Sequence, residues 1–149
     1  MENVDYLIQY LLEENPEVKI NKTPININEK FNLYRSLCNV RQAKPISDEF
    51  IQKEEEFLEE IIKNKNITSI DDIDILDKVY PNNNQNNGDK LCLWRGDITS
   101  LKSGAIVNAA NSQGLGCFIP GHNCIDNQIN TYAGIPLRLE CNEHMKTIN

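Results

Sequence analysis

The front of the chain alternates apolar and polar positions with the period of a helix. In residues 3–14 five apolar side chains fall on one face, and Asn15-Pro16 then ends the pattern, which predicts a helix. A second predicted helix begins near Asn28 and ends before Pro45. Its apolar face carries Phe31, Tyr34, Leu37 and Cys38.

A third helix is predicted after Ser47. Serine is a favoured N-cap residue, and Asp48 and Glu49 suit the positive end of the helix dipole. The apolar stripe of this helix consists of Phe50, Phe57, Leu58, Ile61 and Ile62. Because only a shorter element is expected after Thr68-Ser69, residues 1–80 are interpreted as a small helical N-terminal segment.

The pattern changes beyond residue 80. Residues 81–88 form an asparagine-rich run without apolar side chains, which predicts a linker. Residues 91–94 and 105–108 are short apolar runs typical of buried strands. Residues 125–145 have a helical pattern that is interrupted at residues 134–136.

This order of elements predicts the start of an α/β unit over residues 89–149. Two strands do not complete a sheet core, so we expect an α/β domain that is incomplete. The expected organisation is therefore a helical segment (1–80), a polar linker (81–88) and the first part of an α/β domain (89–149).

The net charge of −7 lies entirely in the front half of the chain. Residues 1–80 carry 17 acidic and 10 basic side chains, whereas residues 81–149 carry five of each. The chain therefore has no basic face for nucleic acid, and it has no apolar run of about 18 residues for a membrane span. Its acidic start differs from a secretory signal, so we expect a cytoplasmic protein. The sequence leaves the oligomeric state open.

Two of the five cysteines flank a histidine. Cys117, His122 and Cys124 form a C-x4-H-x-C cluster in a loop rich in glycine. Thiolate and imidazole are ligands that zinc prefers, and three protein ligands leave a fourth position open. A buried cysteine pair beside an incidental histidine is the alternative, and the spacing alone leaves both open.

The sequence around this cluster resembles the zinc-dependent macrodomains, a group of protein-ADP-ribose hydrolases. The similarity begins at Trp94-Arg95-Gly96-Asp97-Ile98-Thr99 and continues through Ala105-Ile106-Val107-Asn108-Ala109-Ala110-Asn111. It extends through the Cys/His cluster to Cys141. The resemblance implies a three-layer α/β/α fold, of which this chain would hold the beginning.

The resemblance also implies how ADP-ribose would bind. Asp97 would accept a hydrogen bond from the adenine amino group, and the Ile98 amide would support the ring edge. Asn111 would contact the distal ribose. The amides of Ile125 and Asn127 would donate to the diphosphate, and Cys124 and Asp126 are also implied to contact the substrate. From the residues alone, Asp97 and the asparagines are equally explained by turn formation, and Asp126 by the first turn of a helix.

For catalysis the resemblance implies a zinc ion held by Cys117, His122 and Cys124, with Asp126 as the catalytic carboxylate beside the distal ribose. Asn130 departs from the pattern, because a histidine is usual there, and Gly114 replaces a large aliphatic residue. The later strands and the second glycine-rich loop of such domains are missing, so we expect this chain to be inactive alone. Three hypotheses follow: an ADP-ribosyl hydrolase, an ADP-ribose-binding module without turnover, and an inactive remnant that acts as a helical interaction domain.

Overall fold

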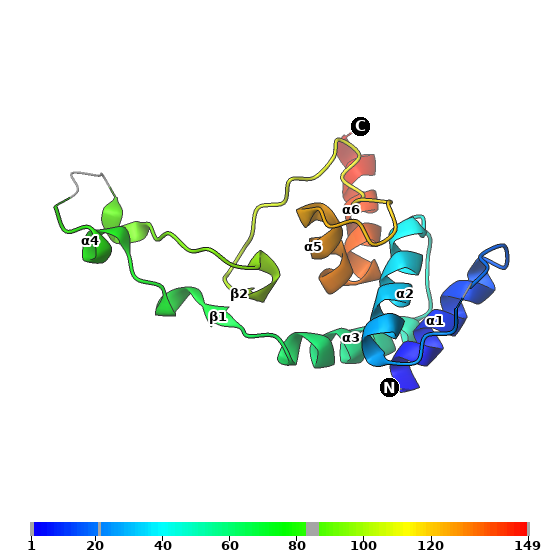
Figure 1. Cartoon of the computed structure of the whole chain (residues 1–149). Helices are drawn as coiled ribbons and strands as arrows, with labels where there is room; N and C mark the ends of the chain where they lie inside the picture. Colours follow the sequence, from blue (N-terminus) through cyan, green and yellow to red (C-terminus); the bar gives the residue numbers. More distant parts are fainter. Residues whose placement is uncertain (1, 21, 83–86, 149) are drawn as a thin grey trace. The chain divides into compact units, whose positions relative to one another are not determined.

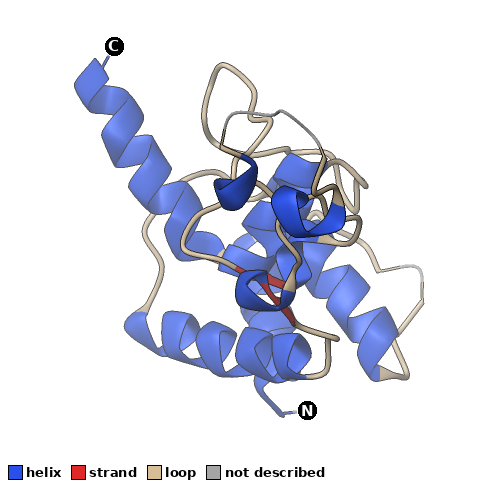
Figure 2. Ribbon diagram, turned by 90° about the vertical axis from the view of Figure 1, so that its left-hand side faces the viewer, coloured by secondary structure: helices blue, strands red, loops and turns tan. Residues whose placement is uncertain are grey.

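The computed structural model describes residues 2–20, 22–82 and 87–148. The fold is mostly helical with one small parallel sheet of two strands, and is therefore mixed α/β (Figures 1 and 2). The chain divides into two compact units, of which the first joins Met1–Ile62 to Asn108–Asn149 and the second is Lys63–Val107. The division expected from the sequence stays a prediction, because much of its linker lies outside the described residues.

The three helices predicted for the front of the chain are confirmed. They are α1 (Glu2–Glu14), α2 (Ile27–Val40) and α3 (Asp48–Lys63). Side chains cap two of them: Asn26 Oδ1 accepts from the Glu29 amide at 2.9 Å, and Ser47 Oγ accepts from the Phe50 amide at 3.2 Å. These bonds satisfy amide groups that the first turn of a helix leaves free.

The interrupted helix predicted near the end of the chain is confirmed as α5 (Ile125–Ala133) and α6 (Ile135–Ile148). Gly134 separates them with a φ of +77°, a value that side chains disfavour. A Cβ atom there would lie 2.6 Å from Glu54 Oε2 of α3. A glycine is therefore required both by the backbone conformation and by the close approach of α3.

One apolar core holds the helices of the first unit together. It contains Val4, Leu7, Ile8, Leu11, Tyr34, Leu37, Cys38, Phe50, Phe57, Leu58 and Ile135. The core thus draws on α1, α2, α3 and the start of α6. Burial of these side chains supplies the main driving force for packing the late helices onto the early ones.

A carboxylate lies inside this core, in the apolar stripe of α3. Glu54 is 1% exposed, accepts from the Tyr34 hydroxyl at 2.5 Å and accepts from the Ile135 amide at 2.9 Å. Burial raises the pKa of Glu54, although these two hydrogen bonds and the charge of Arg41 act in the opposite direction. The carboxylate therefore joins α2, α3 and the start of α6.

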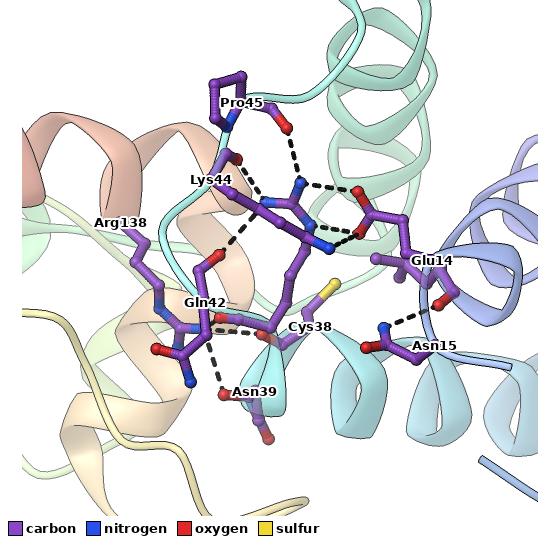
Figure 3. A network of polar contacts seen from close by, with 10 residues as sticks. Glu14, Asn15, Cys38, Asn39, Gln42, Lys44, Pro45 and Arg138 are labelled. Carbon is purple, nitrogen blue, oxygen red and sulfur yellow. Dashed lines mark hydrogen bonds and ion pairs between the residues drawn. The ribbon is translucent and has the colours of Figure 1, made fainter. Parts of the chain in front are cut away.

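Two arginines lie at the C-terminal end of α2: Arg138, which Figure 3 labels, and Arg41, the C-cap residue of the helix. Arg138 of α6 donates to the carbonyl groups of Cys38, Asn39 and Arg41 at 2.8, 3.1 and 2.6 Å. The guanidinium of Arg41 binds both carboxylate oxygens of Glu14, at 2.7 and 3.0 Å. Arg138 thus supplies donors to two carbonyls in the last turn of α2 and to that of Arg41, the C-cap residue.

The second unit contains β1 (Thr68–Ser69) and β2 (Leu101–Lys102), which pair in parallel with Thr68 opposite Leu101. Its helices are α4 (Leu76–Val79) and the 3-10 turns η1 (Ile70–Asp72), η2 (Gly88–Lys90) and η3 (Ile98–Ser100). Within the described ranges, every helix of the chain is too short or too polar to cross a bilayer.

The prediction of strands at residues 91–94 and 105–108 is wrong. Residues 105–108 have no regular structure, and in residues 91–94 only Cys92 forms an isolated bridge, to Ile75. Leu93 and Val107 are 80% and 89% exposed. An apolar run becomes a strand only where neighbouring strands pair with its backbone and other elements cover it, and neither condition is met here.

Candidate metal centre and ligand site

The loop before α5 owes its course to glycines in the left-handed region. Gly116 has a φ of +82° and is buried, and a Cβ atom there would lie 2.6 Å from the side chain of Asn130. Gly121 has a φ of +62° immediately before His122. These two positions let a short loop turn tightly and bring its ends together.

The loop brings Cys117, His122 and Cys124 together, as the sequence predicted for a metal site. Their potential ligand atoms all lie within 4.8 Å of one another, with the thiols half-buried and the histidine exposed. Zinc–sulfur bonds of about 2.3 Å and zinc–nitrogen bonds of about 2.0–2.1 Å, at a tetrahedral angle, place these atoms about 3.6 Å apart. Cys117 Sγ lies 3.6 Å from His122 Nδ1. The donor set and its spacing suit zinc, and ligation would need only a small inward movement of the side chains.

Cys124 has a second role as the N-cap of α5. Its Sγ accepts a hydrogen bond from the Asn127 amide at 3.3 Å. A helix N-terminus favours negative charge, so this position suits a thiolate ligand. The Asn127 amide, which the resemblance assigns to the diphosphate, is engaged by sulfur in this structure, and Asn127 is fully buried.

Asp126 lies in the first turn of α5 and is 4% exposed. Its Oδ1 accepts from Asn108 Nδ2 at 2.7 Å and from Asn130 Nδ2 at 3.1 Å. Two amides thus fix the orientation of the carboxylate, and Asn130 does so from the position where the resemblance expects histidine. Asn108 Oδ1 is buried and, within the described part of the chain, has no hydrogen-bond partner.

Asn111 braces the loop from its other end. Its Oδ1 accepts from the Gln113 amide at 3.0 Å and its Nδ2 donates to the Gly116 carbonyl at 3.1 Å. This agrees with the interpretation of Asn111 as a turn residue. The side chain is exposed, and its predicted contact with ribose stays a prediction.

Asp97 and Ile98 lie in the second unit. Asp97 caps η3, where its Oδ1 accepts from the Thr99 amide at 2.9 Å, and its Oδ2 accepts from Lys65 Nζ at 3.0 Å. Partial burial would raise the pKa of Asp97, but the hydrogen bonds from Thr99 and Lys65 and the charge of Lys65 outweigh it and lower the pKa. Asp97 is thus held as a carboxylate acceptor beside a half-buried Ile98.

Sequence reasoning missed the partners of these residues. Lys65 is 32 positions from Asp97, and Asn108 is 18 positions from Asp126. Neither pairing has a periodic or motif signal. Asn130 stands one helical turn after Asp126, so its spacing could have indicated the contact.

Comparisons with known proteins support one relationship. No protein-family model matches the chain. The chain is 45% identical over 136 residues to a protein-ADP-ribose hydrolase of Treponema medium, a match that covers 91% of the chain and 49% of that relative. It is 38% identical over 140 residues to a protein-ADP-ribose hydrolase of Staphylococcus aureus strain Mu50, covering 94% of the chain and 48% of the relative.

A more distant match is a protein of Fusarium oxysporum f. sp. cubense named a probable bifunctional ADP-ribose hydrolase/ADP-ribosyltransferase, 40% identical over 123 residues. That match covers 78% of the chain and 20% of the relative. The chain spans about half the length of the first two relatives. At 38–45% identity over more than nine-tenths of the chain, these similarities support a relationship to the protein-ADP-ribose hydrolases.

Proposed function

We propose that this chain carries the zinc-holding and ADP-ribose-binding part of a protein-ADP-ribose hydrolase of the macrodomain type, which removes ADP-ribose from modified protein side chains. The observation that carries the proposal is the convergence of Cys117, His122 and Cys124 directly before a helix whose first turn holds Asp126. Hydrolase relatives at 38–45% identity support it.

In this proposal the three loop ligands hold zinc, and the bound metal supplies a Lewis acid beside the distal ribose. Asp126 acts as the catalytic carboxylate. Breaking a glycosidic bond builds positive charge on the ribose and needs a carboxylate of fixed position. The two amides on Oδ1 supply that fixed position and leave Oδ2 for a water molecule or a ribose hydroxyl.

ADP-ribose itself is proposed to bind through the groups that the resemblance implies. Asp97 and the Ile98 amide would receive adenine, because an ionised carboxylate is a strong acceptor for an exocyclic amine. Asn111 would contact the distal ribose. At the start of α5, where the helix dipole favours anions, the Ile125 amide and Cys124 would face the diphosphate. The Asn127 amide, which donates to Cys124 Sγ at 3.3 Å, would share its hydrogen between that sulfur and the diphosphate.

A binding module without turnover is the second candidate. The observation that favours it is the burial of Asp126, which is 4% exposed with one oxygen committed to two amides. A carboxylate so enclosed is well placed to orient a ligand and less accessible to an attacking water.

Release of ADP-ribose from a modified protein tests the proposal, measured with and without zinc on a form that joins this chain to the later strands and second glycine-rich loop of such a domain. We expect release that depends on zinc and that falls at least about 100-fold in Asp126→Asn, because an amide cannot accept a proton from water. The Asn side chain keeps the size of Asp, so the fold should be retained. Binding of ADP-ribose by calorimetry with no release in any form would favour the binding module. An extended form that neither binds nor releases ADP-ribose would contradict both.

A further inference from the structure

Helix α2, in the N-terminal part of the chain, contacts the loop that carries Cys117, His122 and Cys124 through a buried arginine. Arg35 is 8% exposed. Its Nε and Nη2 donate to Asn127 Oδ1 at 3.0 and 2.7 Å, and Nη2 also donates to the carbonyl of His122 at 2.5 Å. These acceptors are uncharged, and among the described residues no carboxylate forms an ion pair with Arg35. The guanidinium of Arg35 therefore acts through the fixed directions of its hydrogen bonds and not through an ion pair.

The two acceptors of Arg35 are tied to two of the three proposed metal ligands. One is the backbone of His122 itself. The other, Asn127, donates its amide to Cys124 Sγ at 3.3 Å and its Nδ2 to the Ile119 carbonyl at 3.0 Å. Movement of the Arg35 guanidinium would thus shift His122 directly and Cys124 through Asn127.

A second residue on the same face of α2 holds the loop one turn further along. Asn39 is 1% exposed, and its Oδ1 accepts from the Gly121 amide at 2.9 Å. Residues four apart on a helix are neighbours, so Arg35 and Asn39 lie next to each other on the face of α2 that contacts the loop. Arg35 thus contacts the carbonyl of His122, and Asn39 contacts the amide of Gly121, the residue before it.

We propose that Arg35 and Asn39 are positioning residues of the metal centre, and that α2 pre-organises His122 and Cys124 for zinc. This inference rests on the proposed zinc site. Groups that orient metal ligands typically change metal affinity by about 10- to 100-fold when they are removed. A role confined to stability would leave the affinity of the folded protein unchanged.

The test is a titration of the full chain with cobalt(II) and zinc, in which chelator competition gives affinity and the cobalt absorption bands report ligand geometry. Arg35→Gln keeps a polar side chain but is shorter and loses the fork of guanidinium donors. We expect metal affinity to fall about tenfold or more, with altered cobalt bands. Arg35→Lys should lie between this variant and the wild type, since its long side chain can bring one donor atom to the acceptors but lacks the planar fork.

Arg41→Gln is the matched control. Arg41 is another buried arginine at the end of the same helix, 3% exposed, but its side chain binds Glu14 and the carbonyls of Gln42, Lys44 and Pro45. We expect this variant to lower thermal stability and to leave metal affinity unchanged. If Arg35→Gln does not fold, Asn39→Ala is measured in the same way, with the same expected loss of affinity.

The outcomes distinguish failure of the positioning role from failure of the proposed zinc site. A wild-type chain that binds neither metal would contradict the zinc site itself. A wild-type chain that binds metal, alongside a folded Arg35→Gln or Asn39→Ala variant of equal affinity and unchanged cobalt bands, would overturn the positioning role alone.

Discussion

The carboxylate of Asp97 has a structural role and a proposed recognition role. It caps η3 through Thr99 and accepts from Lys65, and its side chain is 56% exposed. The lowered pKa keeps the group ionised and therefore a strong acceptor. Both roles depend on the same two oxygens, so a test must separate them.

Substitution at Asp97 separates the two roles by comparing Ala with Asn. Asp97→Ala removes both the cap and the proposed adenine acceptor, and we expect ADP-ribose affinity to fall about tenfold to a hundredfold. Asp97→Asn keeps an oxygen that can cap η3 and should lose less affinity. Titration calorimetry checks the order. Unchanged affinity in a folded Asp97→Ala variant would contradict the adenine assignment.

At the scale of elements, the helices could be predicted and the strands could not. Helical periodicity and the cap at Ser47 depend on neighbouring residues, so α1, α2 and α3 follow from local sequence. A strand depends on partners distant in sequence. The runs at 91–94 and 105–108 have strand-like composition, but β1 and β2 formed elsewhere.

The candidate site divides in the same way. The cluster of Cys117, His122 and Cys124 could be predicted because its ligands lie within eight consecutive residues. The contact between α2 and the start of α5 could not be predicted, since Arg35 and Asn127 are 92 positions apart. Neither residue is unusual within its own segment. A buried arginine in an apolar helix face is visible only after the fold is known.

Glu54 gives a prediction at the scale of packed elements. Its pKa is raised in the folded state, so the folded chain binds the Glu54 proton more tightly than the unfolded chain does. Its contribution to stability is therefore fully present below the ordinary pKa of glutamate, and it is lost as pH rises through the raised pKa. The wild type should lose stability over that interval.

Glu54→Gln isolates this effect because glutamine has no charge to bury. Its oxygen can still accept from the Ile135 amide, and its amide can donate to the Tyr34 hydroxyl oxygen. Denaturant unfolding at a series of pH values should show wild-type stability falling relative to the variant as pH rises above the ordinary glutamate pKa. A difference between the two proteins that is independent of pH would contradict the raised pKa.

At the scale of the whole molecule, the early helices and the loop that carries Cys117, His122 and Cys124 belong to one compact unit. The core includes Ile135 beside residues of α1, α2 and α3, and Arg138 closes the end of α2. The helical front of the chain therefore supports the candidate site and is not separable from it. Substitutions at Arg35 and Asn39, whose side chains contact the loop and Asn127, should affect the loop even though they lie far from it in sequence.

Zinc stoichiometry in the wild-type chain and in Cys124→Ser tests the central claim most directly. Serine is a favoured N-cap residue, so this variant removes the thiolate ligand while the start of α5 keeps its cap. We predict about one zinc per wild-type chain, measured by elemental analysis after removal of loosely bound metal, and a loss of at least about tenfold in affinity in Cys124→Ser. A wild-type chain that retains no zinc, or a folded Cys124→Ser variant that binds zinc as tightly as the wild type, would contradict the assignment of this loop as a metal centre.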